Sequence, residues 1–354
     1  MKNERFEARL QSIPTSIWSL IAQIDEIKGR WTAGAQLNPQ VLSRLKQSVL
    51  VTSTGASTRI EGAKLTDEEI EGLMRGLSVQ KFADRDVQEV RGYFELLKQV
   101  FESWSDIKLS ENTIKHFHKE LLKYAQKDIR HRGEYKSDDN KVVVLDPSGK
   151  IMETLFQPTS AYLTPKEMQE LTEWTEKSLK SHFAHPLLVV GNFIVEFLSI
   201  HPFIDGNGRL SRILTNLLLL QQGYSYMPYI SHEKLIEDNK PAYYLSLRQT
   251  QKTSSTEKND ITFWLEFFLK IILQQSKMAL ELLSQEAIEK LLSPKQLAVW
   301  EYLRKVKEAA PGQVSTQTKV LRPTVNQALS RLLKLKKVER LGLGRSTRYR
   351  VISS

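Results

Sequence analysis

The sequence of 354 residues contains no cysteine, so disulfide bonds and thiolate metal ligands are excluded. It also has no run of ~18 apolar residues, the length that a membrane-spanning helix needs. The N-terminal segment MKNERFEARL lacks the apolar core of a signal peptide. These absences predict a cytoplasmic protein without a membrane partner.

Acidic residues are scarce in only one part of the chain. Residues 294–354 contain 14 Lys and Arg against 3 Glu, a balance of +11. The other 293 residues balance at −1, so the whole net charge of +10 comes from this C-terminal sixth. This asymmetry predicts a separate basic domain at the end of the chain.

Two long apolar runs, residues 186–200 and 210–220, flank the twelve residues HPFIDGNGRLSR at 201–212. Both runs are longer than ordinary strands, so we expect two buried helices joined by a short loop. Around them, helical spacing predominates over most of the first 280 residues. The fold class is therefore predicted to be mainly α.

The loop between these helices has the composition of a polyphosphate site. Gly206 and Gly208 allow the backbone to turn sharply and bring its N–H groups close to a ligand. The helix that follows directs its positive N-terminus to the same place. Arg209 and Arg212 share one face of that helix and can bind an extended anion together.

Two further side chains supply chemistry to the loop. Asp205 can hold Mg²⁺, which uses few carboxylates together with substrate phosphates. His201 is then placed as a general base that acts at a phosphorus atom. Taken singly, a helix-capping His, a polar turn and a solvated Arg pair would explain these residues. None of these interpretations explains their combination within twelve residues.

The twelve residues resemble the signature of the Fic family, HPFxDGNGRxxR, and match it at all nine fixed positions. The resemblance implies a Fic-type helical core with a β-hairpin flap. It also implies a nucleotidyltransferase that transfers AMP from ATP to a Ser, Thr or Tyr hydroxyl of a protein (AMPylation), self-modification included. Members of the family that use other nucleotides or phosphocholine leave the donor open.

The resemblance also assigns roles within the motif. It implies that His201 takes the proton of the target hydroxyl, Asp205 positions magnesium and Phe203 anchors the loop. The phosphate contacts are assigned to Gly206, Asn207, Gly208, Arg209 and Arg212.

Residues 57–62, STRIEG, resemble the inhibitory motif of the family, [S/T]xxxE[G/N], at Ser57, Glu61 and Gly62. The resemblance implies autoinhibition in which Glu61 pairs with Arg212, because a guanidinium that binds a carboxylate cannot also bind the γ-phosphate. Some relatives use this Glu to remove AMP, so de-AMPylation is a second role. An ordinary surface Glu is the alternative.

Residues 141–145 and 150–156 have the alternating pattern of two strands, and residues 146–149 form the turn of the predicted hairpin. The resemblance implies a flap that covers the nucleotide and docks the target peptide along its edge. A surface hairpin without this role is the alternative. The nucleotide-facing residues would be Asn140, Lys141, Val142 and Val143.

The resemblance places the adenine between Tyr243 and Tyr244, with Gln251 as an amide contact. Two neighbouring Tyr on a helix are also common in protein cores, and this alternative stays open. His116 and His118 do not share a helix face at i, i+2, so we expect no metal site there.

We expect four segments: a helical region 1–108 that carries the inhibitory motif, a catalytic core 109–275, a connecting helix 276–293 and a basic domain 294–354. The last contains three helical patterns and a two-strand ribbon, which resemble a winged helix–turn–helix with residues 323–337 as recognition helix. DNA and a protein partner are both open. Phosphate contacts would come from Arg322, Arg331, Lys334, Arg345 and Arg348.

The sequence is compatible with two classes of function. The first is an autoinhibited protein adenylyltransferase, and the second is a DNA-binding regulator whose Fic core senses nucleotide without turnover. The sequence leaves a homodimer open as well.

Overall fold

The computed structural model describes residues 4–34, 39–76, 84–125, 129–145, 151–253, 259–342 and 347–352. They form two compact units, Met1–Leu280 and Glu281–Ser354. Helices predominate in both, as the sequence predicted. None of the helices in the described ranges is both long enough and apolar enough to span a membrane.

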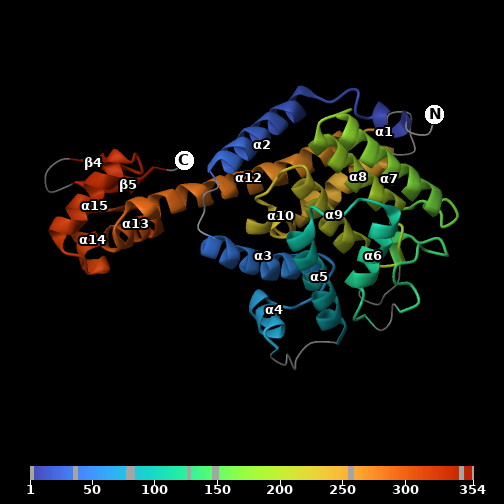
Figure 1. Ribbon diagram of the computed structural model, residues 1–354, viewed down its shortest axis with the longest axis horizontal. Coiled ribbons are helices and arrows are strands. Elements are labelled where there is room, and N and C mark those ends of the chain that lie inside the picture. Colours follow the sequence, from blue (N-terminus) through green and yellow to red (C-terminus); the bar gives the residue numbers. More distant parts are fainter. Residues whose placement is uncertain are drawn as a thin grey trace. The chain divides into compact units, whose positions relative to one another are not determined.

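The first unit is a bundle of helices with one hairpin (Figure 1). Its elements are α1 Glu4–Ala8, α2 Thr15–Gly34, α3 Pro39–Ile60, α4 Asp67–Met74, α5 Asp84–Ser103, α6 Glu111–Leu121, β1 Val142–Leu145, β2 Ile151–Phe156, α7 Thr164–Ser181, α8 Pro186–Ile200, α9 Asn207–Gln221, η2 Met227–Tyr229, α10 His232–Asp238, α11 Lys240–Thr253 and α12 Thr262–Leu291.

The two apolar runs form the centre of this bundle, as α8 and α9 (Figure 1). Nearly all side chains of both helices are buried, because α8 packs on α7 and α9, while α3, α5 and α6 pack on α9. Each fully buried Leu, Ile or Phe contributes about 1.5–3 kcal/mol of burial free energy. The loop between α8 and α9 therefore rests on the most buried part of the unit.

Helix α3 runs without a break from Pro39 to Ile60 and includes Ser57 of the predicted inhibitory motif. The small polar side chains support it, because the hydroxyls of Thr54 and Thr58 donate to backbone carbonyls four residues earlier. Their small size also lets α3 pack closely on α5, α9 and α10.

A Schellman motif ends α3 directly beside the site. Ala63 donates its N–H to the carbonyl of Thr58, and Gly62 donates to Arg59, both at 3.1 Å. Gly62 has φ +105°, a conformation that costs a residue with a Cβ free energy. The motif fixes the direction in which Glu61 leaves the helix.

Buried polar groups connect the helices around α9. Glu233 at the start of α10 accepts hydrogen bonds from the hydroxyl of Tyr93 on α5 (2.9 Å) and from Asn216 on α9 (2.7 Å). Hydrogen bonds between buried polar side chains of this kind favour one arrangement of helices. They therefore fix α9 relative to α5 and α10.

The hairpin β1–β2 is antiparallel and pairs Val142 with Phe156 and Leu145 with Ile151. It agrees with the expected strands, and β2 lies against α11. The expected turn at 146–149 lies outside the described residues.

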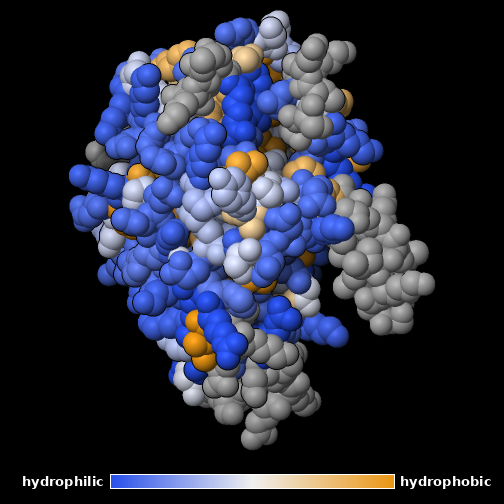
Figure 2. Space-filling model, turned by 90° about the vertical axis from the view of Figure 1, so that its right-hand side faces the viewer, coloured by the Kyte–Doolittle hydropathy of each residue, from blue (hydrophilic) through white to orange (hydrophobic). Residues whose placement is uncertain are grey.

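One face of the molecule, shown in Figure 2, is mainly hydrophilic, with apolar side chains in small separate groups.

The second unit contains α13 Pro294–Val306, β3 Glu308–Ala309, α14 Pro311–Thr318, α15 Arg322–Lys334, β4 Val338–Leu341 and β5 Arg348–Val351. The sequence predicted the three helices and the β4–β5 ribbon but not β3, which joins them in a sheet of order β3-β5-β4. The connecting segment 276–293 begins within α12, which is continuous from Thr262.

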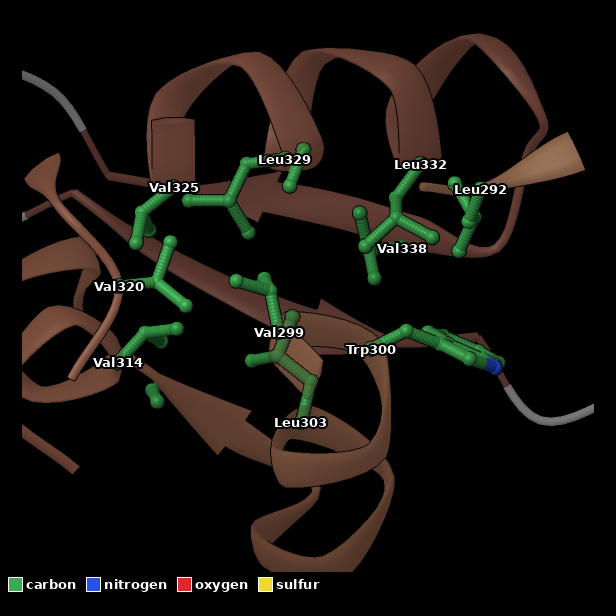
Figure 3. Close-up of a cluster of buried hydrophobic side chains, with 12 residues drawn as sticks. Leu292, Val299, Trp300, Leu303, Val314, Val320, Val325, Leu329, Leu332 and Val338 are labelled. Atoms are coloured by element: carbon green, nitrogen blue, oxygen red, sulfur yellow. The ribbon is translucent and has the colours of Figure 1, made fainter. Parts of the chain in front are cut away.

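The second unit has its own core (Figure 3). Val325, Leu329 and Leu332 of α15 point toward Val299 and Leu303 of α13. All five of these side chains are buried. This packing fixes which face of α15 points inward.

Candidate active site

His201 ends α8 in a left-handed conformation, with φ +50° and its N–H bonded to the carbonyl of Phe197. Burial and the positive charge of Lys136 lower the pKa of its imidazole to about 4. The ring is therefore neutral at pH 7 and can accept a proton. One ring nitrogen is used by a hydrogen bond to the backbone of Leu198, which leaves the other as the base.

Two residues before the flap hold the loop on which His201 lies. Lys136 is almost fully buried, and burial lowers the pKa of its ammonium group to about 8. Its Nζ donates to Asn140 Oδ1 at 2.8 Å, and Asn140 Nδ2 donates onward to the loop. Lys136 Nζ donates to the carbonyl of Ile200 (3.0 Å), and Lys136 N donates to the carbonyl of Pro202 (2.9 Å). Asn140 Nδ2 donates to the carbonyl of Phe203 (3.2 Å).

His118 of α6 supports the loop from its other side. Its Nδ1 accepts the N–H of Gly133 at 2.9 Å, so its Nε2 carries the proton and donates to the carbonyl of Asp205 at 3.0 Å. The ring stacks on Phe203 with centroids 3.8 Å apart. Burial lowers the pKa of His118 to about 4, so it stays neutral. His118 therefore fixes the loop.

The glycine turn is closed by Asn207. Its side-chain amide accepts the N–H of Phe203 at 3.0 Å and donates to the carbonyl of the same residue at 2.7 Å. Gly206, with φ +81°, precedes the first turn of α9. Backbone N–H groups at this helix N-terminus point away from the helix, the arrangement that binds anions.

Asp205 and Arg209 form an ion pair at the same turn. Asp205 Oδ2 accepts from Arg209 Nη2 at 2.8 Å, and its Oδ1 accepts the N–H of Gly206. Although burial opposes its charge, Arg209 lowers the pKa of the Asp205 carboxyl. Arg209 is buried and also pairs with Glu89 of α5, 2.7 Å from Nη1 to Oε2. Glu89 is a contact that the sequence did not indicate.

Arg212 of the motif 201–212 contacts two residues of the predicted inhibitory motif 57–62. Its Nη2 lies 2.8 Å from Glu61 Oε1, its Nε donates to Ser57 Oγ at 2.7 Å, and Nη2 also donates to the carbonyl of Ser57. Burial disfavours the charge of Arg212, but the charge of Glu61 raises the pKa of its guanidinium. Residues about 150 apart in sequence thus share one contact.

Glu61 also occupies the space above the glycine turn. A Cβ placed on Gly208 would lie 2.3 Å from Glu61 Oε1, closer than any real contact. A side chain at position 208 would therefore displace the Glu61 carboxylate from its place at this N-terminus of α9. A phosphate that approached the same N–H groups would meet the carboxylate of Glu61.

The expected adenine contacts divide between core and surface. Tyr243 is buried among Trp264 and Phe267, whereas the neighbouring Tyr244 is partly exposed, with ring centroids 5.2 Å apart. Gln251 lies on the same helix and is partly buried. Burial and the charge of Glu61 raise the pKa of the Tyr244 hydroxyl.

Two of the four predicted flap residues, Asn140 and Lys141, have side chains that the structure describes. The amide of Asn140 is engaged with Lys136 and the Phe203 carbonyl, and Lys141 is exposed. The side chains of Val142 and Val143 lie outside the described residues, so only their place in β1 is known. Lys136, His118 and Glu89 carry no pattern of their own in the sequence, because their roles depend on segments that meet only in the folded unit.

Comparison with known proteins places this site in a family. The model of the Fic/DOC family matches residues 108–219. A Fido domain-containing protein of Dictyostelium discoideum is 36% identical over 83 residues, which cover 22% of this chain and 58% of that protein. A probable protein adenylyltransferase of Aquifex aeolicus is 31% identical over 122 residues, which cover 32% of this chain and 35% of that protein.

The chain thus spans between about a third and three fifths of the length of these two relatives. A solved structure of a Fic family protein from Desulfovibrio desulfuricans G20 matches over 97% of this chain and 98% of its own, with 25% identity and a TM-score of 0.62. The helical architecture, the motif loop and these matches agree that residues 108–219 form a Fic domain.

Proposed function

We propose that this protein transfers AMP from ATP to a hydroxyl group of a protein and that Glu61 holds it in an inhibited state. The observation that carries the proposal is the meeting of a neutral His201, the glycine turn and Arg212 at one helix N-terminus. Nucleophilic attack on the α-phosphorus of ATP needs three kinds of group: a base, N–H donors and a cation.

In this reaction the target hydroxyl gives its proton to the free nitrogen of His201. The hydroxyl oxygen forms a bond to the α-phosphorus of ATP, the bond from that phosphorus to the bridging oxygen breaks, and pyrophosphate leaves. N–H groups of Gly206 to Gly208 face the developing negative charge. Arg212 binds the γ-phosphate once Glu61 has withdrawn.

Asp205 is the residue that would hold Mg²⁺. Its side chain is 34% exposed, and one carboxylate together with phosphate oxygens is sufficient for this ion. Among the described residues there is no group of three or more metal-ligating side chains. When bound, the ion supplies charge neutralisation at the phosphates.

The test is transfer of label from α-labelled ATP to the protein itself and to proteins of a cell lysate. His201→Ala should lower the transfer rate by ~10²–10⁴ while ATP still binds, because the base acts on the target hydroxyl. His116→Ala, a change of an exposed His on α6, is the matched control. Transfer at the wild-type rate by the His201 variant would refute the mechanism.

The same assay distinguishes the alternative functions. Binding of ATP without any transfer of label, even after Glu61→Ala, would favour a nucleotide-sensing regulator. Competition by unlabelled nucleotides identifies the preferred donor. Release of AMP from modified protein by the wild type, lost in Glu61→Ala, would assign de-AMPylation to this carboxylate.

A further inference from the structure

The helix–turn–helix part of the second unit lacks carboxylates. Between Glu308 and Glu339 the chain has thirty residues without one Asp or Glu. The basic residues in this stretch are Lys319, Arg322, Arg331, Lys334, Lys336 and Lys337. Helices α14 and α15 both lie within it, so their surface carries positive charge only.

Helix α15 has two clearly different faces. Its apolar side chains at positions 325, 328, 329 and 332 are buried against α13 and α14 (Figure 3). This spacing leaves the opposite face of the helix to solvent. The exposed side chains there are Asn326, Gln327, Ser330, Arg331 and Lys334.

Among the described residues, the two arginines of β5, unlike the cations on α15, are paired with carboxylates. Arg350 on β5 pairs with Glu308 (2.8 Å) and with Glu339 (3.7 Å), and Arg348 pairs with Glu308 (3.5 Å). Of the three Glu residues within 294–354, Glu308 and Glu339 thus lie on the strands beside β5. The sheet is partly neutralised, whereas the outer face of α15 is not.

We propose that the outer face of α15 binds in the major groove of double-stranded DNA. An α-helix fits the width of this groove, and amide and guanidinium side chains pair there with adenine and guanine edges. Asn326, Gln327 and Arg331 would read bases. Lys334 and Arg322, at the two ends of the helix, would contact phosphates. The proposal uses no residue of the Fic domain and is independent of AMP transfer.

The charge pattern selects this partner over an acidic protein. A protein-binding face of this size is expected to carry exposed aromatic or apolar anchors at its centre. The outer face of α15 instead carries amides, a hydroxyl and cations. Duplex RNA is disfavoured because its deep, narrow major groove does not admit a helix.

The experiment measures binding of the full-length protein to a labelled DNA duplex of random sequence by fluorescence anisotropy over a series of salt concentrations. Affinity should fall with a log–log slope near −0.9 for each phosphate contacted. Lys334→Ala should reduce the magnitude of that slope by about one. The matched control, Arg350→Ala, removes an arginine already paired with carboxylates and should leave the slope unchanged.

Selection of bound sequences from a random duplex library tests base reading. The wild type should enrich a common sequence, and Asn326→Ala with Gln327→Ala should flatten the enrichment without changing the salt slope. Three outcomes would overturn the proposal: no binding at low salt, equal affinity for duplex RNA, or equal losses for Lys334→Ala and Arg350→Ala. Label transfer from ATP, measured on the same variants, should be unaffected, so a failure here is distinguishable from failure of the proposed function.

Discussion

Removal of the Glu61 carboxylate should raise the rate of the proposed AMP transfer. The ion pair with Arg212 is a charge-assisted hydrogen bond at 2.8 Å, and such bonds contribute about 1.5–3 kcal/mol. The Glu61 side chain is 31% exposed, so solvent screening favours the lower end of this range. At ~1.4 kcal/mol for each factor of ten, Glu61→Ala should raise the transfer rate by about tenfold.

The assay compares initial rates of label transfer from α-labelled ATP in wild type and Glu61→Ala, with the fold checked by circular dichroism. Glu71→Ala is the matched control, because it breaks a Glu–Arg pair with Arg75 on the exposed surface of α4. Only an inhibitory carboxylate predicts a gain that is specific to Glu61. An unchanged or lower rate in the folded Glu61 variant would refute the reasoning.

Further predictions concern the same contacts. Arg212→Ala should abolish transfer, and the double variant with Glu61→Ala should behave like Arg212→Ala alone, since both residues act through one contact; activation of the double variant would contradict this. In the Glu61→Ala background, Lys136→Met should move the acid limb of the pH–rate profile to higher pH, because the ammonium group lowers the pKa of His201, whereas Lys136→Arg should leave the limb in place. The pKa of buried His118 is about 4, below its unfolded value of about 6.5, so the unfolded chain binds more protons between these values and stability is lost as pH falls through that window, by up to about 3 kcal/mol. Urea midpoints measured at pH 7 and at pH 4.5 should show this loss, and a smaller one in His118→Gln.

The sequence by itself was sufficient to predict the central helices, the motif loop and the C-terminal charge. Runs of apolar residues at 186–200 and 210–220 can only be buried, and the buried α8 and α9 confirm that expectation. Caps such as those at Thr66 and Ser110 also join a side chain to a backbone group within three residues. Such features depend on local chemistry that neighbouring residues carry.

Only the tertiary structure decided which distant groups share the site. The contacts of Arg209 with Glu89, and of Lys136 with the loop of His201, join segments without any pattern that links them in sequence. The continuous course of α3 through its small polar residues was hidden for a related reason: propensity disfavours Ser, Thr and Gly in helices. Close packing against α5, α9 and α10 overrides that preference, and a packing energy is a property of the fold, not of a sequence window.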